Sequence, residues 1–451
     1  MASQRTEELL KWDREHMVHG RCALGENSGL IIDKGHGIYF QDQEGKEYID
    51  GASQLLCLNL GYGQTEIIDA LLEEMKKLQY AMLFYGFSNE ASIKCGQKLS
   101  ELVPDGLDHF NFTTGGSESI DNAFSIARAY WRAKDRNKYK IIGVYDSYHG
   151  IAGGGLAASG TGKGFYEKHL SPLMPGFIHI PSYYCYRCMF GREYPSCNIQ
   201  CARFLAEVIE KEGPDNIAAF IAEPEMGVAG MIAPPPEYWP MIREICTKYD
   251  VLLIADEVMT GFGRTGKMFA MENWAVKPDI IAMAKGITSA YIPFGAVAFN
   301  DEIWETLKGR NLTTYTYSGH PVCAAAAIKT MEIYTRDKVI ENAALVGKHA
   351  LERLKRDFEP LPCVGEVGGL GLMLGIEIVA DKATKRPFDR KLNIMQQIQD
   401  RALERGIYVR VCSISSAAGD RIAFAPPLTV TTEEVDKALD ILYPILASLN
   451  H

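Results

Sequence analysis

The sequence lacks long apolar runs. No uninterrupted apolar stretch approaches the length of a membrane span, and residues 1–8 lack the apolar core of a signal peptide. It also lacks a sustained basic run, an internal repeat and a low-complexity tract, and its formal net charge is −10. We therefore expect neither nucleic acid nor a membrane as a partner, and a cytoplasmic location is the default expectation.

Cysteine occurs eleven times, and without a recognisable secretion signal we expect reduced thiols rather than a disulfide framework. Four of these residues are close in the sequence: Cys185, Cys188, Cys197 and Cys201. A CxxC pair followed by two more cysteines could form a zinc or iron–sulfur site. The alternative is an irregular surface insert with free thiols, which the wider CxxxC spacing of the second pair favours. We assign no metal ligand from the sequence and leave a metal at these four cysteines open.

The chain is long enough to build a large core. It has 451 residues, of which 47% are hydrophobic and 23% charged. This composition is typical of a soluble, enzyme-sized protein, and the length exceeds that of one simple domain.

Two apolar segments lead into charged residues. Residues 251–256 end at Asp256, and residues 279–284 end just before Lys285. Such runs predict strands buried on both faces of a parallel sheet, where ligands bind at the carboxyl ends. Alone, the aspartate could be a helix cap and the lysine a solvated residue. Together they suit pyridoxal phosphate, because lysine holds its aldehyde as a Schiff base while a carboxylate keeps its ring nitrogen protonated.

Strand and helix patterns alternate along the chain. Apolar residues alternate with polar ones along residues 37–50, on both sides of a Glu-Gly turn, and this pattern predicts a hairpin. The middle of the chain predicts a doubly wound α/β sheet. Its expected strands are His109–Thr113, Lys140–Tyr145, Ile217–Ala222, Val251–Asp256 and Ile280–Met283. We therefore divide the chain into residues 1–65, a large domain over 66–323, and residues 324–451.

The segment Asp256-Glu-Val-Met-Thr-Gly-Phe-Gly-Arg-Thr-Gly266, followed by Ala284-Lys285-Gly286, resembles the signature of class III aminotransferases, a branch of the fold-type I pyridoxal phosphate enzymes. The resemblance extends from about Gly37 to about Glu434. It implies a mostly parallel, doubly wound sheet in the cofactor domain and a smaller α+β domain formed by both chain ends. It also implies that Lys285 and Asp256 are the catalytic residues.

The phosphate group needs backbone N–H donors at the start of a helix. A Gly-Gly-Ser turn follows the strand ending at Thr113, and we predict phosphate contacts at Gly116 and Ser117. Such turns also cap many helices. Here the turn is similar to the phosphate cup of the family, with Gly115 in place of its first serine.

The resemblance implies four further contacts. Tyr148 matches a residue that stacks on one face of the cofactor ring, and Val258 packs on the other face. Glu223, at the end of another expected strand, matches a glutamate near the active site. Thr316 matches a position that reaches the phosphate of the neighbouring subunit, which implies a homodimer with shared active sites.

Substrate recognition is expected at two positions. Arg410 matches a mobile arginine that pairs with substrate carboxylates in many ω-aminotransferases, and a guanidinium suits that contact. The alternative is a surface arginine at a strand end. Leu56 aligns with a tryptophan of amine-using members, so its smaller side chain should reshape the pocket. The segment 412–420 is expected to form a long loop that affects the reach of Arg410.

The resemblance implies transfer of an amino group from an ω-amino acid or primary amine, such as taurine or β-alanine, to an α-keto acid, with pyruvate as the expected acceptor. Lys285 would move the proton between substrate and cofactor. The alternative is a lyase or epimerase of the same family, which would use the same Schiff base. A silent binding protein is a third possibility, against which the retained Lys285 and Asp256 argue. The identity of the donor stays open.

Overall fold

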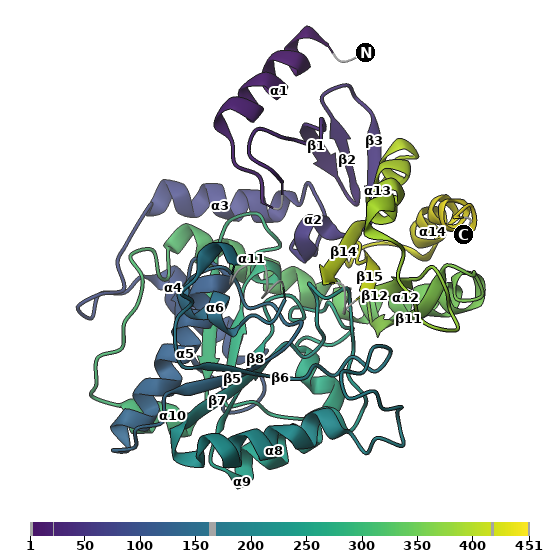
Figure 1. Ribbon diagram of the computed structural model, residues 1–451. Coiled ribbons are helices and arrows are strands. Elements are labelled where there is room, and N and C mark those ends of the chain that lie inside the picture. The colour runs from purple at the N-terminus through teal and green to yellow at the C-terminus, as the bar shows by residue number, and fades with distance from the viewer. Residues whose placement is uncertain (1–2, 21, 162–167, 416–418, 450–451) are drawn as a thin grey trace.

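A computed structural model of the chain describes residues 3–20, 22–161, 168–415 and 419–449, which form three β-sheets surrounded by helices (Figure 1). The α-helices of the described residues are α1 (Gln4–His16), α2 (Ser53–Leu56), α3 (Thr65–Lys77), α4 (Glu90–Ser100), α5 (Gly116–Ala133), α6 (Gly153–Ala158), α8 (Gln200–Glu212), α9 (Tyr238–Lys248), α10 (Asp301–Leu307), α11 (Pro321–Arg336), α12 (Val339–Arg353), α13 (Ile394–Glu404) and α14 (Thr432–Ala447). None of these described helices is both long and apolar enough to cross a membrane.

The central sheet has seven strands in the order β4-β10-β9-β8-β7-β5-β6. They are β4 (His109–Thr113), β5 (Lys140–Val144), β6 (Phe177–Ile180), β7 (Ile217–Ala222), β8 (Leu252–Asp256), β9 (Ile280–Met283) and β10 (Gly295–Phe299). Only β10 pairs antiparallel with its neighbours, β4 and β9. The predicted mostly parallel α/β sheet is confirmed, although the sequence did not indicate β6 or β10.

Helices cover both faces of this sheet, because the central strands carry apolar side chains on both faces. Ile254 and Ala282 belong to a buried cluster that includes the core-facing residues of α5. Their neighbours Leu253 and Ile281 belong to the main core, together with residues of α8 and α9. Side chains alternate across a strand, so the continuous apolar runs supply both faces.

The two ends of the chain meet in a second sheet with the order β1-β2-β3-β13. Its strands are β1 (Ile32–His36), β2 (Tyr39–Asp42), β3 (Glu47–Asp50) and β13 (Ile407–Tyr408). β2 and β3 form the expected hairpin, and Ile407 of β13 lies parallel to Ile49 of β3. Figure 1 shows these segments beside α13.

The third sheet has the order β11-β12-β15-β14. Its strands are β11 (Val364–Leu370), β12 (Met373–Ile378), β14 (Arg410–Ser415) and β15 (Gly419–Phe424). The expected long loop over 412–420 is corrected here: Ser413 pairs with Asp420 and Ser415 with Gly419, so most of the segment is a β-hairpin. Residues 416–418 lie outside the described residues.

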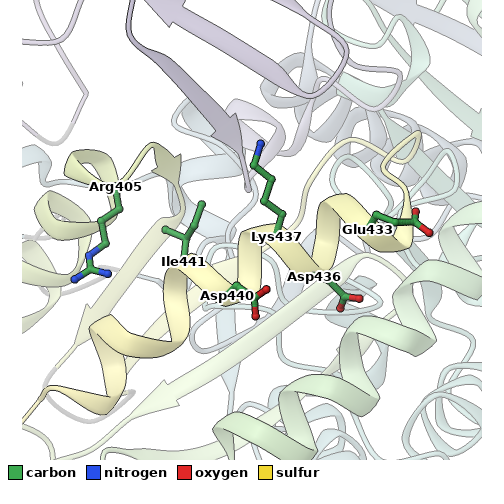
Figure 2. A pocket seen from close by; sticks show the side chains of 6 residues that line it. All are labelled: Arg405, Glu433, Asp436, Lys437, Asp440 and Ile441. Carbon is green, nitrogen blue, oxygen red and sulfur yellow. The ribbon is translucent and has the colours of Figure 1, made fainter.

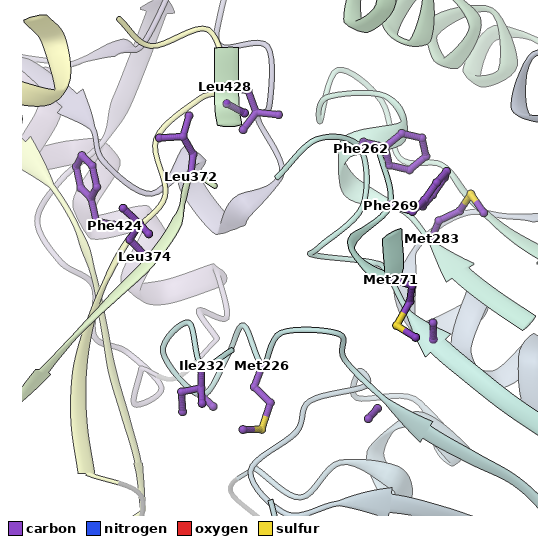
Figure 3. Close-up of a cluster of buried hydrophobic side chains, with 14 of the residues drawn as sticks. Met226, Ile232, Phe262, Phe269, Met271, Met283, Leu372, Leu374, Phe424 and Leu428 are labelled. Atoms are coloured by element: carbon purple, nitrogen blue, oxygen red, sulfur yellow. The ribbon is translucent and has the colours of Figure 1, made fainter. Parts of the chain in front are cut away.

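The main apolar core joins the loops of the central sheet to the third sheet. Figure 3 shows Met226 and Ile232 on the loop after β7, Phe262 and Phe269 after β8, and Leu374 and Phe424 on strands β12 and β15. The expected domain boundary at 65/66 falls at the start of α3, and that at 323/324 falls inside α11. The three-part division stays a prediction.

Candidate active site

The site lies at the edge of the central sheet where β8 and β9 end. Asp256 is the last residue of β8, and Lys285 follows β9 by two residues. Because the two strands are parallel neighbours, their carboxyl ends meet. A cavity of about 160 Å³ brings together seven of the expected site residues: Gly116, Ser117, Tyr148, Glu223, Asp256, Val258 and Lys285.

Lys285 occupies a strained, desolvated position. Its φ of 45° is left-handed, a conformation that costs about 1–3 kcal/mol and is typical of functional sites. Burial and, to a smaller extent, the charge of Arg410 lower the pKa of its amine to about 8, while Cys57 and Asp256 oppose the shift. The amine is therefore closer to its neutral, nucleophilic form than an exposed lysine is.

Asp256 is held by two donors. Its Oδ1 accepts a hydrogen bond from the backbone N–H of Val258 (3.0 Å), and its Oδ2 lies 2.7 Å from Nδ1 of His149. His149 is buried, and its Nε2 has no hydrogen-bond partner among the described residues. Sequence reasoning assigned no role to His149. The available signal was that a buried aspartate at a strand end requires a polar partner.

The glycine turn before α5 is closely packed. A Cβ on Gly116 would lie 2.8 Å from Cγ1 of Val258, and one on Gly150 would lie 2.4 Å from Oγ of Ser117. Glu118 accepts hydrogen bonds from N–H (2.8 Å) and Oγ1 (2.7 Å) of Thr114, which closes the first helical turn. The first residues of α5, at the positive end of its dipole, line the cavity.

Glu223 connects two loops beside the cavity. Its carboxylate accepts hydrogen bonds from the backbone N–H groups of Tyr148 and Gly227, each 2.8 Å long. Burial raises the pKa of Glu223 to about 7. In this geometry the carboxylate fixes the loop that carries Tyr148 and also lines the cavity.

The remaining expected residues differ in placement. Leu56 is buried in a small apolar cluster with Val228 and Met259, against which Tyr148 packs, so it borders the site. Arg410 begins β14 and is half-buried. Thr316 does not line the described cavity, and its carbonyl accepts a hydrogen bond from Tyr80 Oη (2.7 Å).

A wider hollow lies elsewhere, over α14 (Figure 2). Its volume is about 610 Å³, and it is lined by Arg405, Glu433, Asp436, Lys437, Asp440 and Ile441. It contains none of the predicted site residues. The smaller cavity has the chemistry expected of a cofactor site, because it combines a desolvated amine, a buried carboxylate and a helix N-terminus.

Comparison with known proteins assigns the chain to a family. The family model described as aminotransferase class-III matches residues 23–446. A diaminobutyrate–2-oxoglutarate transaminase of Halomonas elongata is 37% identical and covers 95% of this chain and 94% of its own length. A putrescine–pyruvate aminotransferase of Pseudomonas aeruginosa is 35% identical, with 93% and 90% covered.

A solved structure agrees with this assignment. An amine transaminase from an uncultivated Pseudomonas species, in its PLP-bound form, superposes with a TM-score of 0.89 and 33% identity. The match covers 96% of this chain and 98% of that chain.

Proposed function

The chain belongs to the class III aminotransferases, which depend on pyridoxal phosphate, and from this premise we propose that it transfers the amino group of an ω-amino acid or primary amine to an α-keto acid. Taurine and β-alanine are the proposed donors, and pyruvate is the proposed acceptor. The observation that carries the proposal is the cavity in which the Lys285 amine, the Asp256 carboxylate and the first residues of α5 meet. Arg410 lies outside the residues that line this cavity, but near enough for its charge to lower the pKa of that amine. A carboxylate bound at that guanidinium would lie beside the reacting amine.

The cavity residues fit pyridoxal phosphate. Gly116 and Ser117 would bind its phosphate, Tyr148 and Val258 would pack on its ring, and Asp256 would hold the ring nitrogen. When bound, the cofactor supplies an aldehyde that takes up an amino group and a protonated ring that withdraws electrons from the reacting carbon.

The chain's own residues would do the remaining work. Nζ of Lys285, neutral when it is not bonded to the cofactor, would take a proton from the amine-bearing carbon of the donor and deliver it to the carbon of the cofactor that carried the aldehyde. The Oδ atoms of Asp256 would keep the ring proton in place, and His149 would orient that carboxylate through its 2.7 Å contact. Glu223 would hold the Tyr148 loop that excludes water.

We also propose a homodimer with shared active sites. In support, Thr316 lies outside the residues that line the described cavity of one chain. The family position would place it at the phosphate of a neighbouring subunit instead.

The donor and the acceptor can be identified separately. The pyridoxal form is mixed with single amines, namely taurine, β-alanine, putrescine and diaminobutyrate, and its absorbance change is followed. The aminated form is then mixed with pyruvate or 2-oxoglutarate, the acceptors of the two relatives. We expect taurine or β-alanine to react with the highest kcat/KM, and pyruvate to regenerate the enzyme faster than 2-oxoglutarate.

Two outcomes would contradict the proposal. A preference for putrescine or diaminobutyrate as the donor and for 2-oxoglutarate as the acceptor would show that the proposed donors and the proposed acceptor are wrong. Continued turnover of an amine without any keto acid would indicate a lyase or epimerase, because a transaminase stops after one half-reaction.

A further inference from the structure

Four cysteines far from the Lys285 amine line one small cavity. Cys185, Cys188, Cys197 and Cys201 surround a space of about 20 Å³ in the irregular segment between β6 and α8. All four are partly buried and none is in a disulfide. The sequence spacing left open whether the second pair faces the first, and the fold brings both pairs to the same cavity.

The backbone turns sharply to present these thiols. Gly191, with a φ of 62°, donates its N–H to the carbonyl of Cys188 (2.9 Å) and closes the turn after the CxxC pair. Asn198 and Ile199 both have positive φ, 51° and 47°. A left-handed conformation is unusual for a β-branched residue such as Ile199. It directs the chain so that Cys197 and Cys201 lie on the same cavity.

The thiols affect one another electrostatically. Burial, together with charge on Cys201, Cys197 and Cys188, raises the pKa of the Cys185 thiol to about 12. Burial likewise raises the pKa of Cys201 to about 11. A divalent cation would remove the mutual repulsion of the thiolates and displace their protons.

We propose that Cys185, Cys188, Cys197 and Cys201 form a structural zinc site. Four thiolates with two short spacings are the ligand set typical of tetrahedral structural zinc, and all four cysteines line the same small cavity. The sulfur atoms must converge on binding, because no three of them lie mutually within 4.8 Å in the described structure. A change of side-chain rotamer moves a cysteine sulfur by roughly 3 Å, which is enough to close the site.

The zinc site would stabilise a segment that contacts the active-site loop of Glu223. Tyr183 and Tyr184 directly precede Cys185 and also line the cysteine cavity. Tyr183 Oη donates to the carbonyl of Glu223 (2.7 Å), and Tyr184 Oη donates to the carboxylate of Glu377 on β12. A zinc ion would therefore fix the segment that connects the Glu223 loop to the third sheet. This proposal does not depend on the identity of the substrate.

The test is the zinc content of the holoenzyme, measured by mass spectrometry after dialysis against zinc-free buffer and again after reconstitution with Zn²⁺ under reducing conditions. We expect about one ion per chain in the parent and at least a tenfold lower content in Cys188→Ser and in Cys197→Ser. Cys22→Ser is the matched control, because Cys22 is also half-buried but lies outside the cavity. Reconstitution with Co²⁺ should give the absorption bands of tetrahedral thiolate ligation in the parent and in the control only.

The parent measurement stands even if a variant fails to fold. A parent that takes up no zinc after reconstitution overturns the proposal. So does an equal zinc content in the control and both cavity variants, or a mass that shows disulfides between these cysteines.

Discussion

At the scale of single residues, each buried charge of the site has an identifiable partner. Asp256 has a backbone N–H and the ring of His149, and Glu223 has two backbone N–H groups. Lys285 is the exception, because the charge of Arg410 acts on it more strongly than that of either carboxylate. A desolvated amine of this kind is more often neutral, and in that form it can attack an aldehyde.

The variant Asp256→Asn tests the charge at the ring nitrogen. Asparagine keeps the shape and can still accept the Val258 N–H, but it cannot hold a ring proton as a carboxylate does. We expect the rate of the amine half-reaction to fall by about a hundred- to a thousandfold, with a smaller loss of cofactor affinity. Rapid-mixing absorbance measures the rate and equilibrium dialysis the affinity. A near-normal rate would show that Asp256 is not the ring partner.

The pH dependence of cofactor capture tests the environment of Lys285. Only the neutral amine attacks an aldehyde, and its pKa in the folded chain is about 8. Capture of pyridoxal phosphate by the apoenzyme should therefore accelerate as the pH rises toward 8 and level off above it. The measurement is the absorbance change after mixing at a series of pH values.

Two results bear on the same experiment. Lys285→Ala should show no covalent capture at any pH. A rate that continues to rise until the pH reaches about 10.4, the ordinary pKa of lysine, would show that the pKa of Lys285 is not lowered. By linkage, the lowered pKa should make the apoenzyme more stable as pH rises from about 8 to about 10.4, because the unfolded chain binds more protons there.

At the scale of elements, the proposed carboxylate partner Arg410 lies at the start of a strand. β14 begins at Arg410 and pairs with β15, so its guanidinium is carried by a sheet rather than by a loop. We expect Arg410→Ala to weaken the binding of pyruvate by about 10- to 150-fold, since a charge-assisted hydrogen bond contributes about 1.5–3 kcal/mol. A donor without a carboxylate, such as putrescine, should react at nearly the parental rate. The two half-reactions are measured separately.

Arg390→Ala is the control for damage to the sheet. Arg390 pairs with Asp420 on β15, so its loss disturbs the same hairpin without removing the proposed carboxylate partner. Equal losses for pyruvate and putrescine in Arg410→Ala would mean that Arg410 supports structure rather than recognition.

The strands that the sequence predicted well are those whose complete burial requires a continuous apolar sequence. β7, β8 and β9 are continuous apolar runs buried along their whole length, and their bounds agree with the prediction to within one residue. β6 includes a histidine and only the last of its four residues is fully buried, so its pairing with β5 decides its structure. The serine-rich segment after Arg410 resembles a loop, and only pairing with β15 makes it a strand.

The same limit applies to the site. Asp256 and Lys285 could be placed because each follows a strand, and strand ends meet at one edge. His149 could not, because it lies 107 residues from Asp256 and only the fold brings the two side chains together. The cysteine spacing was readable, but whether the second pair faces the first depends on two left-handed residues that no local pattern predicts.

At the scale of the whole molecule, one buried arginine connects parts of the chain that are far apart. Arg264, in the signature segment, donates hydrogen bonds to Ser53 and Asn59 near the N-terminal end and to the carbonyls of Leu372 and Ala425 in the C-terminal part. The signature segment therefore connects distant parts of the fold through Arg264, and it also lines the cavity through Asp256 and Val258.

The proposed shared site predicts complementation between two defective subunits. Lys285→Ala lacks the reactive amine, and Thr316→Val should bind the cofactor weakly because it lacks a phosphate contact. If Thr316 serves the neighbouring subunit, a mixed dimer contains one site with both native residues. Unfolding and refolding an equal mixture should restore parental activity to about one site in four, by random pairing of subunits. Either variant refolded alone should gain nothing. If Thr316 instead served its own chain, every mixed dimer would pair one site lacking Lys285 with one lacking Thr316, and mixing would leave the activity of the two preparations simply averaged.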